Sequence, residues 1–280
     1  MTTVHLGFDM GIRNLAYCLI SHTAEAKWNV LAWDNIDLLE GGVTAQDAKK
    51  CVCGSPAVWI CNADSSKWCK GCATGVRKKK SATAKPSLPV LPCTLTVAPL
   101  RALATEGGMT DVKKAKKETL IDWAKERYLM PWKPAKAMDS SLADVRRAMD
   151  KWLDSVLPTF SQATLIRLEN QPVMKGPTMK SVQIMLYTLL GHRLEKEHSW
   201  TGRIEFVHAG VKTRDSVKAT DLSGAVTEAK AYKARKNAAE TEVTSILTKA
   251  GADGTRWLTF FSGRSKKSDL ADAFLMAMRA

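Results

Sequence analysis

The chain has 280 residues, of which 45% are hydrophobic, and its 42 Lys and Arg outnumber 28 Asp and Glu to give a formal charge of +14. No apolar run approaches the ~20 residues of a membrane span, and the N-terminus lacks a secretion signal, so we expect a soluble, intracellular protein. The positive charge is typical of proteins that bind polyanions, and nucleic acid is the expected partner. The length allows one large domain with an insertion or two small domains.

Three strands are expected in the first 40 residues. Residues 4–8 are apolar, residues 14–21 alternate after a Gly-Ile-Arg turn, and residues 28–36 are rich in aromatic and branched side chains. An antiparallel meander is the simplest arrangement of three strands that follow one another so closely.

The composition changes after Gly41-Gly42. Five cysteines fall between Cys51 and Cys72, and a basic run follows at residues 77–80. The prolines of SATAKPSLPVLP at residues 81–92 then exclude regular structure. The basic run is interpreted either as a linker that touches phosphate or as a nuclear-import signal. Amphipathic helices rich in Lys or Arg are expected at residues 110–128 and 140–156.

Strands and helices alternate in the last part of the chain. Strands are expected at residues 163–169 and 203–208, and helices at residues 183–196, 228–249 and 266–279, with a GADG loop at residues 251–254. Together with the first three strands, this order predicts an α/β fold in which helices flank a mixed sheet. The expected core comprises residues 1–40 and 159–280, and it is interrupted by a cysteine-rich and Pro-rich segment at residues 41–93 and a helical segment at residues 94–158.

Four carboxylates lie where a strand ends or a helix begins. Asp9 follows the first strand, Glu169 ends the fourth, and Asp269 and Asp272 share one face of the last helix. Each alone could be a turn aspartate, a surface ion pair or a helix N-terminal acid. Acids at adjacent strand ends can converge, however, and clustered carboxylates are costly unless a cation neutralises them. Oxygen ligands select Mg²⁺ or Mn²⁺, and two such ions can support phosphodiester cleavage.

Four stretches of the chain are GFDMGIRNLAYCLI, LIRLENQP, YKARKNAAETEVTSIL and KKSDLADAFLMA, and they fall within residues 1–40 and 159–280, a little over half of its length. They resemble the motifs of RuvC-like Holliday junction resolvases, particularly the poxviral and fungal mitochondrial type. The resemblance implies an RNase H-like fold, a homodimer and metal-dependent nicking of four-way DNA junctions in recombination and repair. It assigns the catalytic acids that would hold two Mg²⁺ or Mn²⁺ ions to Asp9, Glu169, Asp269 and Asp272. It also implies an active-site lysine, for which Lys212 is the candidate and Lys218 the competitor.

The cysteines form two closely spaced pairs within CVCGSPAVWICNADSSKWCKGC. The first pair is Cys51 with Cys53 and the second is Cys69 with Cys72. The two pairs are separated along the chain by about the spacing of the two ligand pairs in a zinc finger, which suits a tetrahedral structural Zn²⁺. Cys61 is either the spare cysteine or a replacement for Cys51 or Cys53. Buried free cysteines are the alternative, but five within one short polar segment favour zinc in a reducing compartment. Four protein ligands leave no open catalytic position, so the ion would stabilise the insertion.

The segment LTVAPLRALATEGGMTDVKKAKKETLIDWAKER is similar to a SAP motif, a small helix-loop-helix DNA-binding element. Its apolar frame would comprise Leu95, Leu100, Leu103, Gly108, Leu120 and Ile121. The predicted DNA-binding residues are Lys113, Lys114, Lys116 and Lys117 in this segment and Arg13, Lys233, Arg235 and Lys236 elsewhere. An amphipathic helical pair with solvated lysines remains the alternative for this segment.

The expected function is the resolution of four-way DNA junctions by paired, symmetrical nicks. Such a junction has approximate two-fold symmetry, so a C2 dimer would place two identical active sites on opposed strands. Two alternatives remain open: a nuclease of the same fold that cuts flaps, forks or hybrids, and a non-catalytic zinc-containing DNA-binding protein. Viral, phage and organellar settings suit the sequence equally well.

Overall fold

The chain divides into two compact units, which we call the core unit, Met1–Gln46 with Lys136–Ala280, and the inserted unit, Asp47–Ala135. The computed structural model describes residues 2–25, 27–44, 47, 49–76, 86–134, 136–137, 140–171, 177–208 and 228–279. The basic run at residues 77–80 and the two candidate lysines Lys212 and Lys218 lie outside the described residues.

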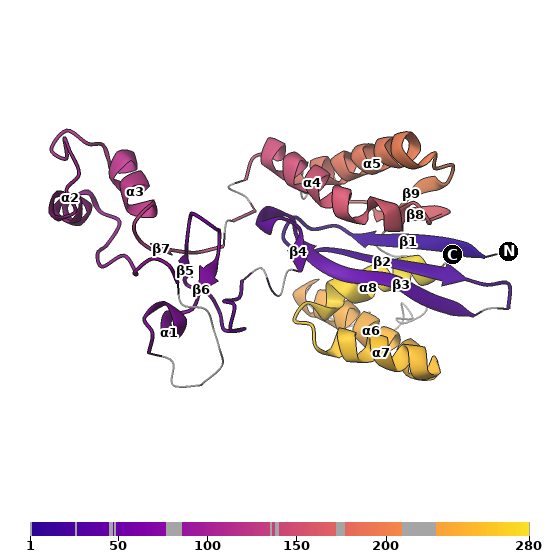
Figure 1. Cartoon of the computed structure of the whole chain (residues 1–280). Coiled ribbons are helices and arrows are strands. Elements are labelled where there is room, and N and C mark those ends of the chain that lie inside the picture. Colours follow the sequence, from indigo (N-terminus) through magenta and orange to yellow (C-terminus); the bar gives the residue numbers. More distant parts are fainter. Residues whose placement is uncertain are drawn as a thin grey trace. The chain divides into compact units, whose positions relative to one another are not determined.

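The core unit is built on one mixed sheet (Figure 1). Its strands are β1 (Thr3–Asp9), β2 (Leu15–His22), β3 (Trp28–Asp37), β4 (Val43–Thr44), β8 (Leu165–Glu169) and β9 (Arg203–Val207). In the order β4-β3-β2-β1-β8-β9, strands β1 to β4 pair antiparallel, whereas β1, β8 and β9 pair in parallel. The predicted antiparallel meander and the predicted mixed sheet are thereby confirmed.

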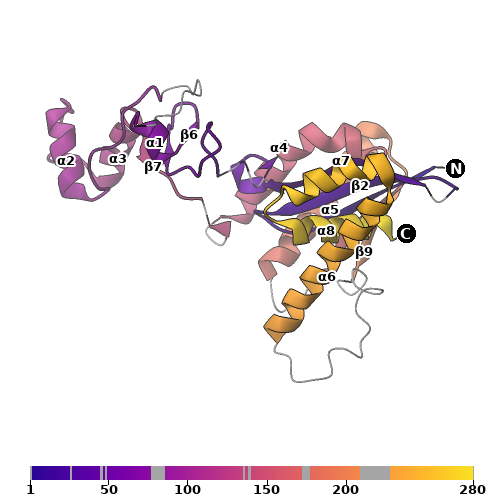
Figure 2. The same ribbon diagram turned by 90° about the horizontal axis from the view of Figure 1, so that it is seen from below.

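Helices cover both faces of this sheet (Figures 1 and 2). They are α4 (Leu142–Phe160) and α5 (Pro177–His198) on one face, and α6 (Glu228–Lys249), α7 (Gly251–Ser262) and α8 (Lys267–Met278) on the other. Leu6 and Phe8 of β1 point to the α4–α5 face, where Phe8 meets Trp152 and Phe160 edge to face. Full burial of such side chains contributes about 1.5–3 kcal/mol each.

The second face is centred on Trp33 of β3. Its ring stacks on Phe261 of α7 at a centroid distance of 5.3 Å and also contacts Phe274 of α8. The indole N–H donates to the carbonyl oxygen of Leu270 at 3.1 Å, so the buried polar group has a partner. These contacts fix α7 and α8 on the sheet.

Gly7 lets α8 approach β1 more closely than any other residue would allow. A Cβ atom at this position would lie 2.5 Å from the carbonyl oxygen of Ala273 and 2.9 Å from the Cβ of Met276. Side chains alternate along a strand, so His5 and Asp9 point to the same face of the sheet as Gly7. The helix that carries the predicted Asp269 and Asp272 therefore passes directly over the strand that ends in Asp9.

The boundaries of the core unit differ from the sequence-based expectation. Residues 94–158 were expected to form one helical insertion, but α4 belongs to the core unit. Met149, Leu153 and Leu157 of this helix are buried against the sheet. The exposed face of α4 is rich in charge, which made the helix resemble part of a DNA-binding insertion.

Helix α7 replaces the expected GADG loop. Gly251 has a φ of +69° and follows the end of α6, and the next residues continue as a helix. Gly254 is buried, and a Cβ there would collide with the carbonyl oxygen of Leu247. Gly251 therefore serves the turn between α6 and α7, and Gly254 permits their close crossing.

The inserted unit has a three-stranded antiparallel sheet in the order β6-β5-β7. Its elements are β5 (Trp59–Ile60), β6 (Lys67–Trp68), β7 (Met130–Pro131), α1 (Lys70–Ala73), α2 (Val97–Glu106) and α3 (Lys117–Lys125). Helix α3 is shorter than the expected helix at residues 110–128, because residues 107–116 form turns in which Asp111 has a φ of +55°.

Strand β7 joins the two parts of this unit. Leu129 is buried in the cluster that contains the cysteines, whereas Met130 is buried in the cluster between α2 and α3. The cysteine-rich hairpin and the helical pair therefore form one module rather than the two insertions expected from the sequence. Among the described residues, none of the helices is long and apolar enough to cross a membrane.

Candidate active site and cysteine cluster

Asp9 and Glu169 end two adjacent parallel strands. Phe8 pairs with Leu168 across β1 and β8, so Asp9 and Glu169 occupy the next position in the register. Residues at matching positions point to the same face, and neighbouring strands lie about 4.8 Å apart. Both side chains are partly buried. The structure therefore brings these two predicted acids together at the C-terminal ends of the parallel strands.

The contacts of α8 show that it runs antiparallel to β1. Near the end of the helix, the carbonyl oxygen of Met276 accepts a hydrogen bond of 3.2 Å from Arg167 in the middle of β8. The carbonyl oxygen of Ala277 lies 3.1 Å from Nε2 of His22, which pairs with the first residue of β1. The C-terminal end of α8 thus lies over the start of the strands, and its first turn lies toward the strand ends that carry the acids.

The two aspartates of α8 belong to this end of the sheet. Asp272 precedes Met276 by one helical turn, about 5.4 Å, and Met276 faces Gly7. Asp9 lies two strand residues beyond Gly7, about 6.6 Å, in the same direction. Asp272 is therefore level with Asp9, and Asp269 lies three residues earlier at the start of the helix.

Lys236 of α6 is bonded to the first of these aspartates. Its Nζ lies 3.1 Å from Oδ1 of Asp269 and 3.1 Å from the hydroxyl of Ser268, which itself donates to Asp269 at 3.0 Å. The side chain of Lys236 is 31% exposed and that of Asp269 is 14% exposed. The sequence predicted Lys236 as a DNA-binding residue but did not place it at the acids. Only the packing of α6 on α8 distinguishes it from its basic neighbours.

Gln171 holds the Glu169 side chain in place and is itself held by Gln183. The side-chain amide of Gln171 donates to Oε2 of Glu169 at 3.0 Å. The backbone N–H of Gln171 donates to Oε1 of Gln183, a fully buried residue of α5, at 3.1 Å. The sequence did not indicate either contact, and the bond to Gln183 forms only when α5 packs on the sheet.

Arg13 lies in an ion pair of the core unit. Its Nη2 is 2.6 Å from Oδ2 of Asp37 and 3.6 Å from Oε1 of Glu40, and the Asp37 side chain is fully buried. The guanidinium therefore neutralises a carboxylate that is removed from water. Its predicted contact with DNA stays a prediction, as do those of Lys233 and Arg235, which are exposed on α6.

The four predicted zinc ligands lie together in the inserted unit. They are Cys51, Cys53, Cys69 and Cys72, and all four sulfur atoms lie within 4.8 Å of one another. Among the described residues, no three of the acids at the sheet end are gathered so tightly. The buried Cys61 is not part of this set, although it lies in the same hydrophobic cluster.

The cysteine cluster fits a tetrahedral zinc ion. The sulfurs of Cys53 and Cys69 are 3.7 Å apart. Four thiolates at the usual zinc–sulfur distance of 2.3 Å would lie about 3.8 Å from one another. Hydrogen bonds from the hydroxyl and the backbone of Ser55 lower the pKa of the Cys53 thiol to about 6, and thiolate is the form that binds metals. The cluster could therefore hold a metal ion, and zinc is the ion that its sulfur ligands suit.

The leucines and the isoleucine of the predicted apolar frame pack together in the helical pair, whereas Gly108 is exposed in the turn after α2 with a φ of +75°. Leu100 of α2 and Leu120 of α3 are fully buried, and Leu95, Leu103 and Ile121 contact the same cluster. The predicted DNA-binding lysines, Lys113, Lys114, Lys116 and Lys117, are all exposed before or at the start of α3. Their contact with DNA remains a prediction.

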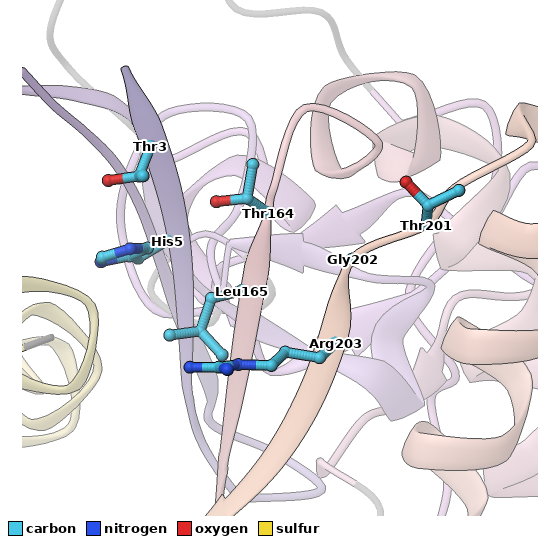
Figure 3. A pocket seen from close by; sticks show the side chains of 7 residues that line it. All are labelled: Thr3, His5, Thr164, Leu165, Thr201, Gly202 and Arg203. Atoms are coloured by element: carbon cyan, nitrogen blue, oxygen red, sulfur yellow. The ribbon is translucent and has the colours of Figure 1, made fainter. Parts of the chain in front are cut away.

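A shallow pocket lies at the opposite end of the core sheet from the acids (Figure 3). It has a volume of about 290 Å³, and His5, Leu165 and Arg203 line it from one register position of β1, β8 and β9. Burial, and next the neighbouring His22, lower the pKa of His5, which favours its neutral form. None of the predicted catalytic acids lines this pocket.

The core unit is thus a mixed α/β domain. Acids from two parallel strand ends and from one helix lie at the same end of its sheet. No protein-family model and no curated protein matches the chain. A solved structure, the crystal structure of the yeast mitochondrial Holliday junction resolvase Ydc2, is similar at 12% identity and a TM-score of 0.39, over 98% of this chain and 77% of that chain. So weak a likeness carries no functional argument, and the site itself must provide one.

Proposed function

We propose that the chain is a metal-dependent endonuclease that resolves four-way DNA junctions. The observation that carries the proposal is the arrangement of Asp9, Glu169, Asp269 and Asp272 at one end of the core sheet, with Lys236 bonded to Asp269. Acids contributed by separate elements to one sheet edge are costly to the fold unless they bind cations, so their position favours a catalytic use.

The donor set suits Mg²⁺ or Mn²⁺. Mg²⁺ commonly keeps several waters and binds through one or two carboxylates, so the acids need not be as close as the four sulfurs. Asp9, Glu169 and Asp272 would hold the ions, and Gln171 orients the Glu169 carboxylate through its hydrogen bond. When bound, such ions activate a water and stabilise the leaving oxygen of a phosphodiester.

Lys236 provides a positive charge at the point where a DNA phosphate would meet the acids. Its ammonium group neutralises Asp269 and is held by Ser268. A neighbouring phosphate oxygen is an equally suitable acceptor, so we assign Lys236 to the active site. With Lys212 outside the described residues, Lys236 is the described lysine that the geometry favours for this role.

The remaining basic residues would bind the DNA backbone. The formal charge of +14 and the exposed lysines near the start of α3 suit phosphate contacts, which weaken as salt rises and carry little sequence information. We propose a homodimer, because paired nicks on opposed strands of a two-fold junction need two sites. Zinc in the inserted unit would be structural, with all four positions filled by cysteines.

The proposal is tested with the wild-type chain on four labelled substrates: a four-way junction, a linear duplex, a flap and an RNA–DNA hybrid. Each is incubated with Mg²⁺, with Mn²⁺ or with EDTA. We expect symmetrical nicks in the junction that yield religatable duplexes and that disappear in EDTA. Cleavage confined to flaps or hybrids would contradict the proposed substrate. Tight binding without cleavage under any metal would contradict the enzyme and favour a DNA-binding protein.

A further inference from the structure

An exposed aromatic pair lies where α5 meets the edge strand β9. The rings of Tyr187 and Phe206 have a centroid distance of 5.2 Å, and the side chains are 41% and 40% exposed. Ile184, which lies one turn before Tyr187 on α5, is 44% exposed. Of the eight large hydrophobic side chains that are exposed in the described part of the chain, three therefore gather on this patch. We call Tyr187 and Phe206, together with Lys180, which contacts the Phe206 ring, the aromatic platform.

Lys180 connects the aromatic platform with the candidate active site. Its Nζ lies 5.4 Å from the centre of the Phe206 ring, within the range of a cation–π contact. The same Nζ donates to Oδ1 of Asn170 at 2.8 Å. Asn170 directly follows Glu169, and its backbone N–H donates to the carbonyl oxygen of Val207, the last residue of β9.

The register of the sheet relates the aromatic platform to the acids. Phe206 pairs with Leu168, and Glu169 pairs with Val207 at the next position. Because side chains alternate, Phe206 and Glu169 point to opposite faces at the same end of the sheet. A DNA strand with its phosphate at the acids could thus place a neighbouring base over the end of β9 and onto the aromatic rings.

We propose that Tyr187 and Phe206 stack on a nucleobase that is unstacked at the branch point, while Lys180 contacts an adjoining phosphate. The inference rests on the proposed function, since it takes branched DNA as the ligand. Every base has a π face, so such stacking holds a strand without reading its sequence. A branch point supplies the unstacked base that a continuous duplex lacks.

The charge of the aromatic platform favours DNA over a second copy of the chain. In a two-fold interface the same patch meets itself, and the two Lys180 side chains would approach each other. Like charges in a surface that loses water oppose such contact. A phosphate next to the stacked base would instead neutralise Lys180.

The test uses junction binding in an Asp9→Asn background, which removes cleavage from the measurement. Phe206→Leu and Tyr187→Leu keep apolar bulk but remove the aromatic faces, whereas Phe206→Tyr keeps one. Leu31→Ala on β3 is the control for loss of an exposed apolar side chain. We expect each leucine variant to weaken junction binding about 5- to 100-fold relative to linear duplex. Phe206→Tyr and Leu31→Ala should bind as the background does.

A 2-aminopurine base at the branch point provides a direct readout of stacking. Its fluorescence should change on binding of the background protein and of Phe206→Tyr, and the change should be lost with Phe206→Leu. The inference would be overturned if the leucine variants bound the junction as tightly as the background protein and still gave the full fluorescence change on binding. A fall in the solution mass of these variants from dimer to monomer would also overturn it, because the patch would then join two copies.

A parallel cleavage assay with the unsubstituted chain separates this inference from the proposed function. Absence of cleavage, together with a fluorescence change that needs Phe206, would refute the nuclease and leave the aromatic platform supported. Normal cleavage by Phe206→Leu and Tyr187→Leu at low protein concentration would refute the aromatic platform and leave the nuclease supported.

Discussion

Lys233 and Lys236 lie one helical turn apart on α6 and have different surroundings. Lys233 is exposed, whereas Lys236 lies between Ser268 and Asp269. The sequence assigned both lysines to DNA binding, because a charged helix gives no sign of which of its residues meets another helix. Because of this contact with α8, we propose an active-site role for Lys236 and a contact with the DNA backbone for Lys233.

This difference predicts two distinct phenotypes. Lys236→Met should lower the cleavage rate of bound junction roughly 100-fold, as expected when one charge at a reacting phosphate is lost, with little effect on affinity. Lys233→Met should weaken binding to all DNA and lower the slope of log affinity against log salt concentration by about one. Cleavage at saturating protein should be normal. Single-turnover cleavage and salt-dependent binding measure the two effects. Equal losses in both variants would contradict the assignment.

The Arg13–Asp37 pair predicts a stability defect. Removal of one partner of a buried ion pair leaves an uncompensated charge and costs about 3–5 kcal/mol. Arg13→Ala should lower the free energy of unfolding by that amount in urea denaturation, because Asp37 is fully buried. Arg147→Ala, which breaks an exposed pair with Asp144, should leave the free energy of unfolding nearly unchanged, because water screens exposed charges. An unchanged stability with weaker DNA binding would instead favour the predicted DNA contact of Arg13.

At the scale of elements, strand ends were the most informative feature of the sequence. Asp9 and Glu169 could be predicted to meet because each ends an apolar strand, and the two strands pair in parallel. The contact of Gln171 with Gln183 could not be predicted, since it depends on where α5 docks. Helix α7 was missed because glycine is usually a turn residue, whereas Gly254 lies inside the helix and permits a close helix crossing.

The close contact at Gly7 predicts that the arrangement of the acids depends on the position of α8. Gly7→Ala would place a methyl group 2.5 Å from the carbonyl oxygen of Ala273, so α8 must shift. We expect a loss of about 1–3 kcal/mol in the free energy of unfolding, as is usual for overpacking, with reduced cleavage because Asp272 moves away from Asp9. Denaturation and cleavage of the same preparation measure both effects.

Gly191→Ala is the matched control for this substitution. Gly191 lies within α5, and the nearest atom to an added Cβ is the flexible Cδ1 of Ile204 at 3.4 Å. The change should leave stability equal or raise it by about 0.5–1 kcal/mol, as alanine suits a helix better than glycine. Similar losses in both variants would contradict the special role of Gly7.

At the scale of the whole molecule, the sequence predicted local features better than it predicted the division into units. The cysteine pairs and the alternating strands are short-range features, and both are present as expected. The boundary at residue 158 was misplaced, because the apolar face of α4 is compatible with either unit until it packs on the sheet. The shared sheet of the inserted unit escaped prediction because β7 lies about 70 residues after its partner β5.

The architecture of the inserted unit predicts that metal removal also affects its helical pair. Leu129 and Met130 link the cysteine cluster to the hydrophobic cluster between α2 and α3. The free energy of metal binding at such a site contributes to the free energy of folding. We expect one zinc per chain by elemental analysis. Its loss in Cys72→Ser should raise hydrogen exchange in residues 97–125 while residues 142–160 stay protected. Cys93→Ser, outside the cluster, should retain zinc; protection of residues 97–125 without zinc would contradict the coupling.

The most direct test of the account is junction cleavage by Asp9→Asn beside the unsubstituted chain and the control Asp253→Asn, in which an exposed carboxylate of α7 is neutralised. We predict that Asp9→Asn binds the junction at least as tightly as the unsubstituted chain but makes no nicks with Mg²⁺ or Mn²⁺, whereas Asp253→Asn cleaves normally. Undiminished paired nicking by Asp9→Asn would contradict the claim that the acids at this end of the sheet form the active site.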